Sequence, residues 1–563
     1  MRLTAFWRGA TLLVAACVAA FGRTVTHGFL LWDDRAFIAD NPLIAHPSAA
    51  TLVTLWTRPH LDLYAPLTYT LWAGVAALAG PAAWAYHLTN VALHGLAAWA
   101  VFALLRDLGG RGSEAGALAG ALLFAVHPLQ TEAVAWASET KDLLSALFAL
   151  AAIRAYLLFR ERGDRRVYVA ASIAFACALL AKPSAVATPA IVLVLERTLR
   201  RRSWGDSVGW LGPWFLGAAA FAAASAIIQP ASDVLPWVPP LWLRPAVALD
   251  TLGFYVRKLV FPLDLVPDYG RTSQSLASTG ALAYGWAPAA GVIALAGWLR
   301  HSAPWLGVAV AVFVAALLPV LGLVPFDFQY YSNVADHYVY LAMLGPALGL
   351  ALAFPALPPA ARRVAVPVAL AGLLVLTIRQ ASIWKDDPTL YARTLAVNPA
   401  SIMAHNNTGQ MLEERGELEQ ALVQYQKALD LDPGNASALN NVGNVLFKQG
   451  RYDEAIQHYT AVLGLGQIPE RQPKTRIFAA RMHNNLGAAY LKKARYRDAV
   501  GEFQRASALD PDYLEPCYNL GIVLMEFGRY GDAIEAFRKG LAIDPHHSAL
   551  RAQLEVALSR AGR

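Results

Sequence analysis

Up to about residue 380, the chain consists of long apolar runs separated by short segments that hold Pro, Gly and charged residues. A helix needs about 20 mostly apolar residues to span a bilayer, and we predict about eleven spans, some short enough to be tilted or interrupted. The predicted spans are 4–25, 82–105, 115–126, 143–158, 167–180, 185–195, 208–228, 281–299, 305–324, 339–354 and 364–378. Two more apolar segments, 67–79 and 242–261, are bordered or interrupted by Pro, Arg or Lys, and we expect interfacial or re-entrant helices there.

After about Trp384 the pattern changes to charged, amphipathic sequence with an internal repeat. Glycines recur at steps of 34, 44 and 34 residues, and an alanine follows each glycine twelve positions later. The positions are Gly409, Gly443, Gly487 and Gly521, with Ala421, Ala455, Ala499 and Ala533. A 34-residue helix–turn–helix unit with small residues at the helix crossing is the tetratricopeptide pattern. We predict repeats at about 402–435, 436–469, 480–513 and 514–547, a capping helix at 548–563, and a loop in the extra residues 466–474.

These patterns together predict an all-α protein with two domains. Residues 1–380 would form a polytopic helical membrane domain, and residues 381–563 an α-solenoid of tetratricopeptide repeats, with 384–399 as a leading half-repeat. The solenoid's concave face would suit an extended peptide or protein segment.

Basic residues mark alternate short loops between the apolar runs, and such loops face the cytoplasm. The basic loops hold Arg106 and Arg111, residues 160–166, residues 197–202, Arg300, and Arg362 and Arg363. The N terminus carries Arg2 and Arg8, so an odd number of spans places the repeats outside, on the side of Asp33. The first run also resembles a cleaved signal peptide, with small residues at 19–20, but the later spans favour an uncleaved helix. We predict a bacterial inner membrane with periplasmic repeats, or an endoplasmic reticulum membrane with lumenal repeats.

Composition narrows the function only slightly. The net charge of +7 is thinly spread, and its densest piece, 200–202, fits a cytoplasmic loop rather than a nucleic-acid site. The three cysteines offer neither a disulfide framework nor a zinc-binding spacing.

Candidate chemistry begins at Trp32-Asp33-Asp34, directly after the first run. Two carboxylates at a membrane boundary mark either a water-facing site or an ordinary polar loop. Further polar residues gather on the predicted outer side, many at helix ends, where a buried reaction site would need acids and bases. They are Asn41, His87, Asn90, His94, His127, Glu132, Glu139, Lys141, Asp142, Lys182, Arg257, Lys258, Asp268, Tyr269, Asp336, His337 and Tyr338. Loops always hold charged residues, so each of these residues, taken alone, also fits a purely structural role.

Several stretches resemble the transmembrane-and-tetratricopeptide O-mannosyltransferase family. The similar segments are Trp32-Asp33-Asp34 with Asn41-Pro42, Tyr86-His87-Leu88 with Asn90 and His94, Phe124-Ala125-Val126-His127-Pro128 with Glu132, Leu180-Ala181-Lys182, and Asp336-His337-Tyr338-Val339-Tyr340-Leu341. More distantly, the first half resembles polytopic glycosyltransferases of the GT-C class, which use polyprenyl-phosphate sugars. Two residues depart from the family pattern: Ala65 stands where Arg is frequent, and His337 follows Asp336 where Arg is frequent. Either change could alter phosphate binding or the donor.

The resemblance implies transfer of a sugar, mannose in this family, from a polyprenyl-phosphate carrier to Ser or Thr hydroxyls of exported proteins, with inversion. Asp33 would be the general base, and Asp34 would orient acceptor or sugar. Candidates for binding the donor phosphate, in falling order, are Lys182, Arg257, Lys258, Lys141 and His127. Glu132, His87, Asp336, His337 and Tyr338 complete the predicted donor site. We expect no cofactor and no metal, although an acidic pair can also hold a divalent cation.

The repeats would hold the acceptor, and asparagine amides could grip its backbone. The candidates are Asn407, Asn441, Asn485 and Asn519, and their alternative role is packing between repeats. Two rival functions remain open: a glycosyltransferase acting on a lipid or envelope glycan, and a non-catalytic membrane scaffold for envelope proteins.

Overall fold

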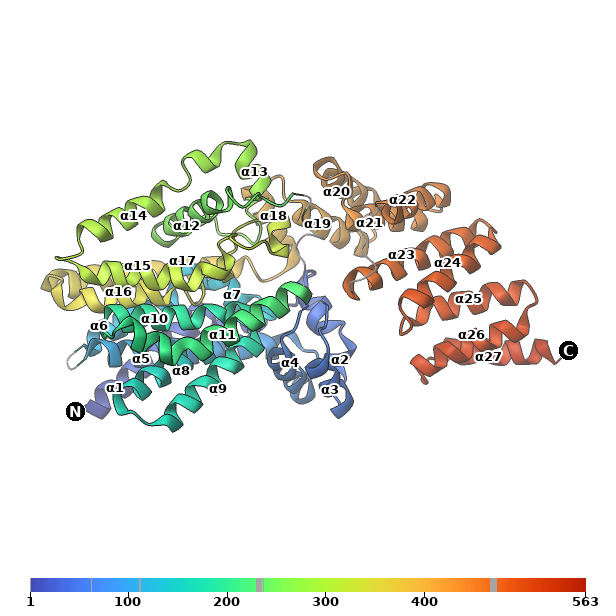
Figure 1. Cartoon of the computed structure of the whole chain (residues 1–563). Helices are drawn as coiled ribbons and strands as arrows, with labels where there is room; N and C mark the ends of the chain where they lie inside the picture. Colours follow the sequence, from blue (N-terminus) through green and yellow to red (C-terminus); the bar gives the residue numbers. More distant parts are fainter. Residues whose placement is uncertain are drawn as a thin grey trace. The chain divides into compact units, whose positions relative to one another are not determined.

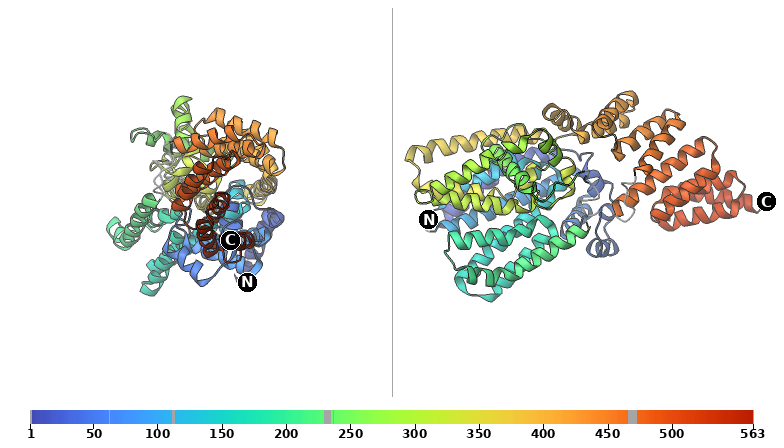
Figure 2. Two further views of the ribbon diagram at one scale, coloured as in Figure 1. Left: turned by 90° about the vertical axis from the view of Figure 1, so that its right-hand side faces the viewer. Right: turned by 45° about the horizontal axis from the view of Figure 1, so that its top comes forward.

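The computed structural model describes residues 2–61, 63–110, 113–228, 235, 237–465 and 473–562. Every regular element in these residues is a helix, and one isolated bridge joins His60 and Leu63. The chain divides into two compact units, Met1–Ser401 and Ile402–Arg563. The first unit is a bundle of long helices, and the second is a series of helix pairs (Figures 1 and 2).

The helices of the first unit follow the apolar runs. They are α1 (Arg2–Phe21), α2 (Pro42–Ala45), α3 (Ala49–Thr57), α4 (Pro66–Ala79), α5 (Ala83–Gly109), α6 (Glu114–Val126), α7 (Thr131–Ala135), α8 (Thr140–Arg162), α9 (Arg165–Ala181), α10 (Thr188–Thr198), α11 (Trp204–Ile228), α12 (Arg244–Val260), α13 (Ser273–Ser278), α14 (Ala287–Trp298), α15 (Pro304–Leu317), α16 (Leu344–Ala353), α17 (Val366–Ser382) and α18 (Asp387–Val397).

Six helical segments in the described part are long and apolar enough to cross a membrane, and a seventh is possible if a bent pair counts as one span. The six are Gly9–Thr26, Ala83–Gly109, Ala137–Arg162, Trp204–Ile228, Ala281–Trp298 and Ala361–Ser382; the bent pair joins Glu114–Val126 to Pro128–Ala135 at 53°. The other predicted spans are helical but shorter, for example 17 residues in α9 and 11 in α10. Prolines such as Pro183, Pro304 and Pro355 lie at or near their ends, where a missing N–H and a fixed φ limit helix length.

Small residues let the central helices approach closely. A Cβ atom on Gly120 of α6 would lie 2.3 Å from the carbonyl oxygen of Ala347 on α16. Likewise, a Cβ atom on Gly345 of α16 would lie 2.5 Å from the carbonyl oxygen of Ala309 on α15. This glycine-mediated packing is typical of helices in membranes, and it produces the closely stacked α6, α16 and α15 of Figure 1.

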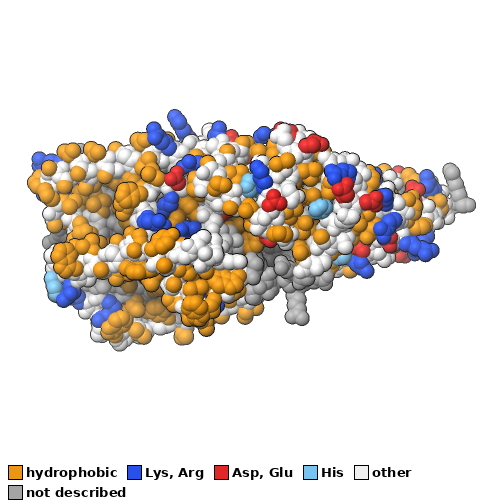
Figure 3. Space-filling model, turned by 90° about the horizontal axis from the view of Figure 1, so that it is seen from above, with side chains coloured by type: hydrophobic (Ala, Val, Ile, Leu, Met, Phe, Trp, Pro, Cys, Tyr) orange, Lys and Arg blue, Asp and Glu red, His pale blue; other side chains and the backbone are white. Residues whose placement is uncertain are grey.

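The surface agrees with a membrane location for the first unit. On the face in Figure 3, hydrophobic side chains cover most of its helices, whereas Lys, Arg, Asp and Glu are interspersed over the repeat helices. Several exposed side chains are large and apolar, including Leu216, Ile227 and Trp298, each more than 70% exposed. Exposed apolar surface of this extent fits contact with lipid or with another apolar surface.

The segments that follow α1 and α17 are joined by hydrogen bonds. The backbone N–H of Leu31 donates to Oδ1 of Asp387 at 2.9 Å, and that of Gly28 donates to the carbonyl oxygen of Lys385 at 3.4 Å. The chain therefore leaves the helices of the first unit beside the Asp33 loop. This relationship holds whatever the number of spans in between.

The first unit extends further along the chain than the predicted boundary at 380. Its last helix, α18, is held there because Ser401 donates to the Asp268 carboxylate at 2.5 Å and Arg393 pairs with Asp264 at 2.6 Å. The stretch that resembled a leading half-repeat thus belongs to the first unit.

The second unit has the helix pairs expected of tetratricopeptide repeats. Its helices are α19 (Ile402–Glu414), α20 (Leu418–Leu431), α21 (Ala436–Lys448), α22 (Tyr452–Gly464), α23 (Pro473–Lys492), α24 (Tyr496–Leu509), α25 (Leu514–Glu526), α26 (Tyr530–Ile543) and α27 (Ser548–Ala561). A Cβ atom on Gly443 would lie 2.6 Å from the ring of Tyr459, so the recurring glycine makes room for an aromatic residue of the paired helix. Most of the predicted 466–474 loop lies outside the described residues.

Candidate active site

The two adjacent aspartates after α1 lie in different environments. The Asp33 side chain is 29% exposed, and its Oδ2 lies 3.5 Å from Nζ of Lys141. Asp34 is completely buried, and its carboxylate accepts backbone N–H bonds from Leu30 at 3.1 Å and from Ser138 at 2.8 Å. Asp33 is therefore available to a bound molecule, whereas Asp34 fastens its own loop to the turn before α8.

Burial is the main cause of a raised pKa at Asp34, which reaches about 7, although the two backbone N–H bonds act in the opposite direction. A carboxyl group removed from water favours its neutral form unless charge or hydrogen bonds compensate. Asp34 therefore changes charge near neutral pH.

A single buried amide holds the irregular turn that precedes α8. The Asn90 side chain on α5 donates to the carbonyl oxygens of Trp136 at 2.8 Å and of Val134 and Ala137 at 3.4 Å. Its Oδ1 accepts the Thr140 hydroxyl at 2.6 Å. The turn between α7 and α8 includes the 3-10 helix η4 (Ala137–Glu139), in which Trp136 and Ala137 already accept backbone N–H bonds, so the Asn90 amide reinforces this turn from a neighbouring helix.

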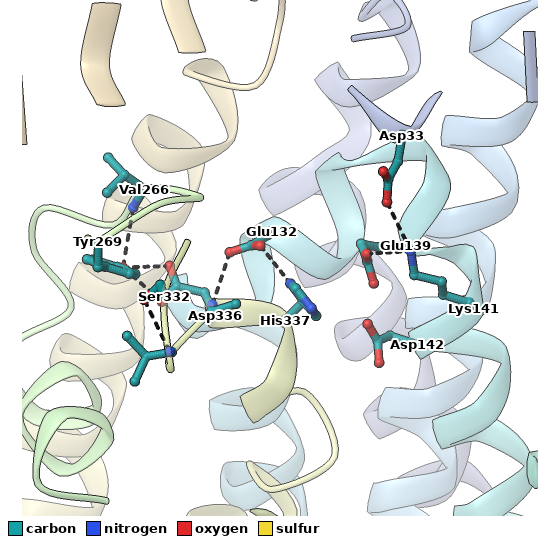
Figure 4. A network of polar contacts seen from close by, with 12 residues as sticks. Asp33, Glu132, Glu139, Lys141, Asp142, Val266, Tyr269, Ser332, Asp336 and His337 are labelled. Carbon is teal, nitrogen blue, oxygen red and sulfur yellow. Dashed lines mark hydrogen bonds and ion pairs between the residues drawn. The ribbon is translucent and has the colours of Figure 1, made fainter. Parts of the chain in front are cut away.

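An ionic cluster extends inward from Asp33, as Figure 4 shows in part. Nζ of Lys141 lies 3.0 Å from Glu139, which in turn lies 3.4 Å from Nζ of Lys182. Nζ of Lys182 lies 2.5 Å from Asp142. Glu139 is 1% exposed and both ammonium groups are at most 13% exposed, so each charge depends on its partners for stabilisation.

A second polar group adjoins this cluster through His337. Oε1 of Glu132 lies 2.7 Å from Nδ1 of His337, and Oε2 of Glu132 accepts the backbone N–H of Asp336 at 3.0 Å. The Tyr269 hydroxyl donates to the Asp336 carboxylate at 2.9 Å (Figure 4). Residues more than 200 positions apart are thereby brought into one network.

Burial also shifts the titration of this second group. It raises the pKa of Asp336 to about 7, against the Tyr269 hydrogen bond and the charge of Lys258. It lowers the pKa of His337 to about 3, so the imidazole is neutral at physiological pH. A neutral imidazole has one donor and one acceptor nitrogen, and Nδ1 is the nitrogen that faces Glu132.

Three of these side chains could in principle hold a metal ion. One ligand atom each from Glu139, Asp142 and His337 lies within 4.8 Å of the other two. Lys182 already lies at ion-pair distance from both carboxylates and Lys141 from Glu139, however, so a divalent metal ion would compete with two ammonium groups. These carboxylates therefore fit lysine ammonium groups as partners better than a divalent metal ion.

Aromatic rings border the exposed carboxylate. Trp32 stacks on Trp136 with ring centres 5.0 Å apart and faces Phe328 at 6.2 Å. Nζ of Lys182 lies 5.9 Å from the centre of the Tyr338 ring, a cation–π distance. The predicted donor-site residues Lys141, Lys182, Glu132, Asp336, His337 and Tyr338 are thus all in or next to the network.

The two predicted histidines of the earlier helices bond to backbone instead. Nε2 of His87 lies 3.3 Å from the carbonyl oxygen of Gly28, and Nε2 of His127 lies 3.1 Å from that of Leu259. Nδ1 of His127 also accepts the backbone N–H of Leu129 at 3.2 Å. These contacts join segments of the chain, and the donor-binding role of both histidines stays a prediction.

The two predicted basic residues of α12 are also apart from Asp33. Arg257 is exposed, and Nζ of Lys258 donates to the carbonyl oxygens of Leu263 at 2.5 Å and Asp264 at 3.2 Å. Lys258 does lie 5.2 Å from the Tyr269 ring centre, at the far end of the network.

Glu139, Asp142, Asn90 and Tyr269 were recognised from the sequence only as outer polar residues, without a role. The signal for the first two was available, because Glu139, Lys141 and Asp142 cluster at the start of one apolar helix. The partners of Asn90 and Tyr269 are distant in sequence, and no local pattern reveals them.

The predicted acceptor-binding asparagines lie on the first helices of the repeats. Asn407 is buried, and Asn441, Asn485 and Asn519 are half-buried. Their amides join neighbouring repeats: Asn441 donates to Asn406 at 3.0 Å, Asn485 to Asn440 at 3.2 Å and Asn519 to Asn484 at 3.0 Å. A packing role is therefore visible for them, and a peptide-binding role stays a prediction.

Comparison with known families divides the chain in the same way. The sequence pattern of the dolichyl-phosphate-mannose-protein mannosyltransferase family matches residues 64–227. Patterns of the tetratricopeptide repeat match residues 409–450, 434–512 and 484–548.

Several proteins with similar sequences are named protein O-mannosyl-transferases. The chain is 34% identical over 173 residues to protein O-mannosyl-transferase Tmtc1 of Drosophila melanogaster, covering 29% of this chain and 20% of that protein. It is 24% identical over 422 residues to protein O-mannosyl-transferase F38B6.6 of Caenorhabditis elegans, covering 71% of this chain and 59% of that protein. It is 33% identical over 156 residues to protein O-mannosyl-transferase TMTC3 of Mus musculus, covering 26% and 16%. The matches therefore cover less than two thirds of each relative.

Among solved structures, the tetratricopeptide-repeat protein YrrB, described as having an unusual peptide-binding site, is 24% identical. That match covers 31% of this chain and 84% of YrrB, with a TM-score of 0.26.

Proposed function

We propose that this chain, which matches the transmembrane-and-tetratricopeptide-repeat family of protein O-mannosyltransferases in both of its parts, transfers mannose from a polyprenyl-phosphate carrier to Ser or Thr hydroxyls of proteins. The observation that carries the proposal is Asp33. It is the more exposed carboxylate of a charged network, and it is paired with an ammonium group at 3.5 Å.

In the proposed reaction, Asp33 accepts the proton of the attacking hydroxyl. The hydroxyl oxygen bonds to the anomeric carbon while the bond from that carbon to the phosphate oxygen breaks, and the electron pair of that bond stays on the phosphate. One base suffices because a phosphate leaves without protonation, whereas hydrolysis of an ordinary glycoside needs a second carboxyl group as acid. Attack from the face opposite the leaving group inverts the anomeric configuration.

Lys141 and Lys182 are the cations best situated to stabilise the departing phosphate. Both are nearly buried, and a charge in a poorly solvated site interacts more strongly than one in water. Arg257 and Lys258 are weaker candidates, because the first is exposed and the second already binds two carbonyl oxygens.

The remaining residues would position these groups. Asp34 holds the Asp33 loop through backbone N–H bonds rather than contacting a substrate. Neutral His337 lacks the positive charge that favours an ionised phosphate, so its imidazole suits a sugar hydroxyl better. Glu132 would hold the His337 ring in place, because it contacts Nδ1 of His337 and also accepts the backbone N–H of Asp336.

The proposal places the site and the repeats on the outer side of the membrane. The hydrogen bond between Leu31 and Asp387 supports this arrangement, since it brings the exit of the membrane unit next to the Asp33 loop. A GT-C-like set of about eleven spans would require α9, α10, α15 and α16 to cross as short or tilted helices. A repeat groove that captures the acceptor would raise its local concentration at Asp33.

The test is a transfer assay on the purified full-length chain with polyprenyl-phosphate [³H]mannose and a Ser/Thr-rich protein acceptor. Labelled acceptor that releases mannose under β-eliminating conditions, with equal rates in the presence of EDTA and of added Mg²⁺, supports the proposal. Label found only in lipid or glycan favours that rival acceptor class. No turnover of the donor in any fraction favours the scaffold.

A further inference from the structure

The end of the membrane unit opposite Asp33 carries a concentrated basic surface. Helix α8 begins at the ionic cluster and has 23 residues, so its C-terminal end lies about 35 Å from its first residue. The chain turns twice at this end, at residues 160–166 between α8 and α9 and at residues 196–206 between α10 and α11. These two turns hold eight arginines and four acidic residues, an excess of four positive charges.

Ion pairs join the two turns into one surface. Arg160, whose side chain is 7% exposed, pairs with Glu196 at 2.8 Å and also with Asp206. Arg200 pairs with Glu161 at 2.5 Å. These contacts fasten the α10–α11 turn to the C-terminal end of α8, so the remaining arginines of both turns are held on a common support.

Four arginines of this surface are exposed and, in the described part of the chain, have no acidic partner. They are Arg162, Arg165, Arg166 and Arg201. The acidic residues of the turns are engaged elsewhere, three of them in the ion pairs above and Asp164 at the start of α9, where it accepts the backbone N–H of Arg166 at 2.9 Å. Guanidinium groups bind phosphate oxygens through paired N–H bonds, so a phosphate group fits the four exposed arginines.

Exposed apolar side chains continue from the arginines along α9. Arg165, Val169 and Ile173 follow one another at steps of four residues, which places them on one face of the helix. Val169 is 55% exposed and Ile173 is 59% exposed. At the start of α11, Trp204 is 61% exposed, and the guanidinium group of Arg197 lies 4.6 Å from the centre of its ring. An exposed tryptophan at the end of an apolar helix is typical of the headgroup level of a membrane.

We propose that this basic surface binds the headgroup of an anionic phospholipid, with the acyl chains along Val169 and Ile173. The surface is separate from the proposed reaction, because it lies at the other end of α8 from Asp33. A basic residue beside an anionic lipid surface strengthens binding by about fivefold. A soluble anion suits the surface less well, because it would leave the apolar side chains of α9 uncovered.

Native mass spectrometry of the purified full-length chain in detergent tests the proposal with two added lipids. The wild type should bind phosphatidylglycerol at least about 10-fold more tightly than phosphatidylcholine, whose headgroup has no net charge. A variant that combines Arg162→Gln, Arg165→Gln and Arg166→Gln should bind phosphatidylglycerol about 100-fold more weakly and phosphatidylcholine within about twofold of the wild type.

The matched control removes three positive charges from other helix ends of the same unit. A variant that combines Arg300→Gln, Arg362→Gln and Arg363→Gln should bind phosphatidylglycerol within about twofold of the wild type. Equal losses in the two triple variants, or equal wild-type affinities for the two lipids, would overturn the proposal. Full competition by glycerol 3-phosphate would also overturn it, because the surface would then bind a soluble phosphate.

Arg201→Gly provides a second variant in case the triple variant does not fold. Arg201 has a φ of 51°, a backbone conformation that glycine favours, so the substitution removes a charge without adding strain. Arg201→Gly should keep at least the wild-type Tm and bind phosphatidylglycerol about fivefold more weakly. Wild-type affinity of Arg201→Gly for phosphatidylglycerol would contradict the placement of the headgroup between the two turns.

Discussion

The Asp34 carboxylate accepts the backbone N–H of Ser138 at 2.8 Å, although the two residues are 104 positions apart. This bond connects the loop after the first membrane helix to the turn that presents Glu139 and Lys141. It gives the two adjacent aspartates separate functions: Asp34 sets the geometry, and Asp33 is left available for chemistry.

The first prediction concerns the pH dependence of stability. The pKa of Asp34 is raised to about 7, above its value in an unfolded chain, because burial disfavours the charged form. Its contribution to stability is therefore complete below about pH 4 and is lost as the pH rises through about 7. The Tm of the wild type should exceed that of Asp34→Asn by more at pH 5 than at pH 8. A Tm difference independent of pH would show that Asp34 does not titrate in this range.

The second prediction concerns the turn held by Asn90. Thr140→Val removes the hydroxyl that donates to Asn90 at 2.6 Å, while Thr140→Ser retains it. Because the turn positions the charged network rather than binding substrate, Thr140→Val should lower kcat by about 10-fold with little change in KM, and Thr140→Ser should restore kcat. Thr377→Val is the control, since Thr377 makes an equally buried hydroxyl bond, to Val126 at 2.6 Å, on another helix. Equal effects of Thr140→Val and Thr377→Val on kcat would mean that Asn90 and Thr140 contribute only to general stability.

The third prediction concerns the donor phosphate. Lys182→Met keeps an unbranched side chain but removes the ammonium group beside Asp142 and Glu139. It should lower kcat/KM for the donor by about 100-fold, because it removes a cation from a poorly solvated site. Arg393→Met removes a cation on the same unit that pairs with Asp264, and serves as the matched control. A larger effect of Lys182→Met on acceptor KM than on donor use would exclude Lys182 from the phosphate site.

The fourth prediction separates the repeats from the chemistry. In Gly443→Ala, the new Cβ would lie 2.6 Å from the Tyr459 ring, so the repeat should lose about 1–3 kcal/mol of stability through overpacking. Transfer to protein acceptors should show a raised KM, whereas transfer to a short peptide should be unchanged. Gly434→Ala is the control, because its nearest neighbour would be at 3.5 Å. An equal effect of Gly443→Ala on the KM for the protein acceptor and on the KM for the short peptide would mean that the repeats have no role in acceptor capture.

The sequence was sufficient to predict the helical elements, because apolar runs and the spacing of Gly443 and Ala455 are local signals. It predicted more spans than the helix lengths support, since prolines such as Pro319, which follows the end of α15 at Leu317, interrupt helices within continuous apolar sequence. The first unit ends at Ser401, which bonds to Asp268, and this contact between residues 133 positions apart leaves no local signal in the sequence.

The candidate site was only partly predictable for the same reason. Its residue types were visible at helix ends, but their pairing was not. The distinction between Asp33 and Asp34 depends on Ser138 and Lys141, and the link from Glu132 to His337 crosses 205 positions. Such contacts form only when the chain folds, so no spacing of residues along the sequence reveals them.

The most direct test of the account is the transfer rate of Asp33→Asn in the full-length chain. The amide keeps the size of the side chain but cannot accept the hydroxyl proton, so kcat should fall by about 10²- to 10⁴-fold. Asp40→Asn, at an exposed acidic residue of the same segment, should keep wild-type activity, and both variants should keep the wild-type Tm. A turnover of Asp33→Asn within about twofold of wild type would contradict the role of Asp33 as the base.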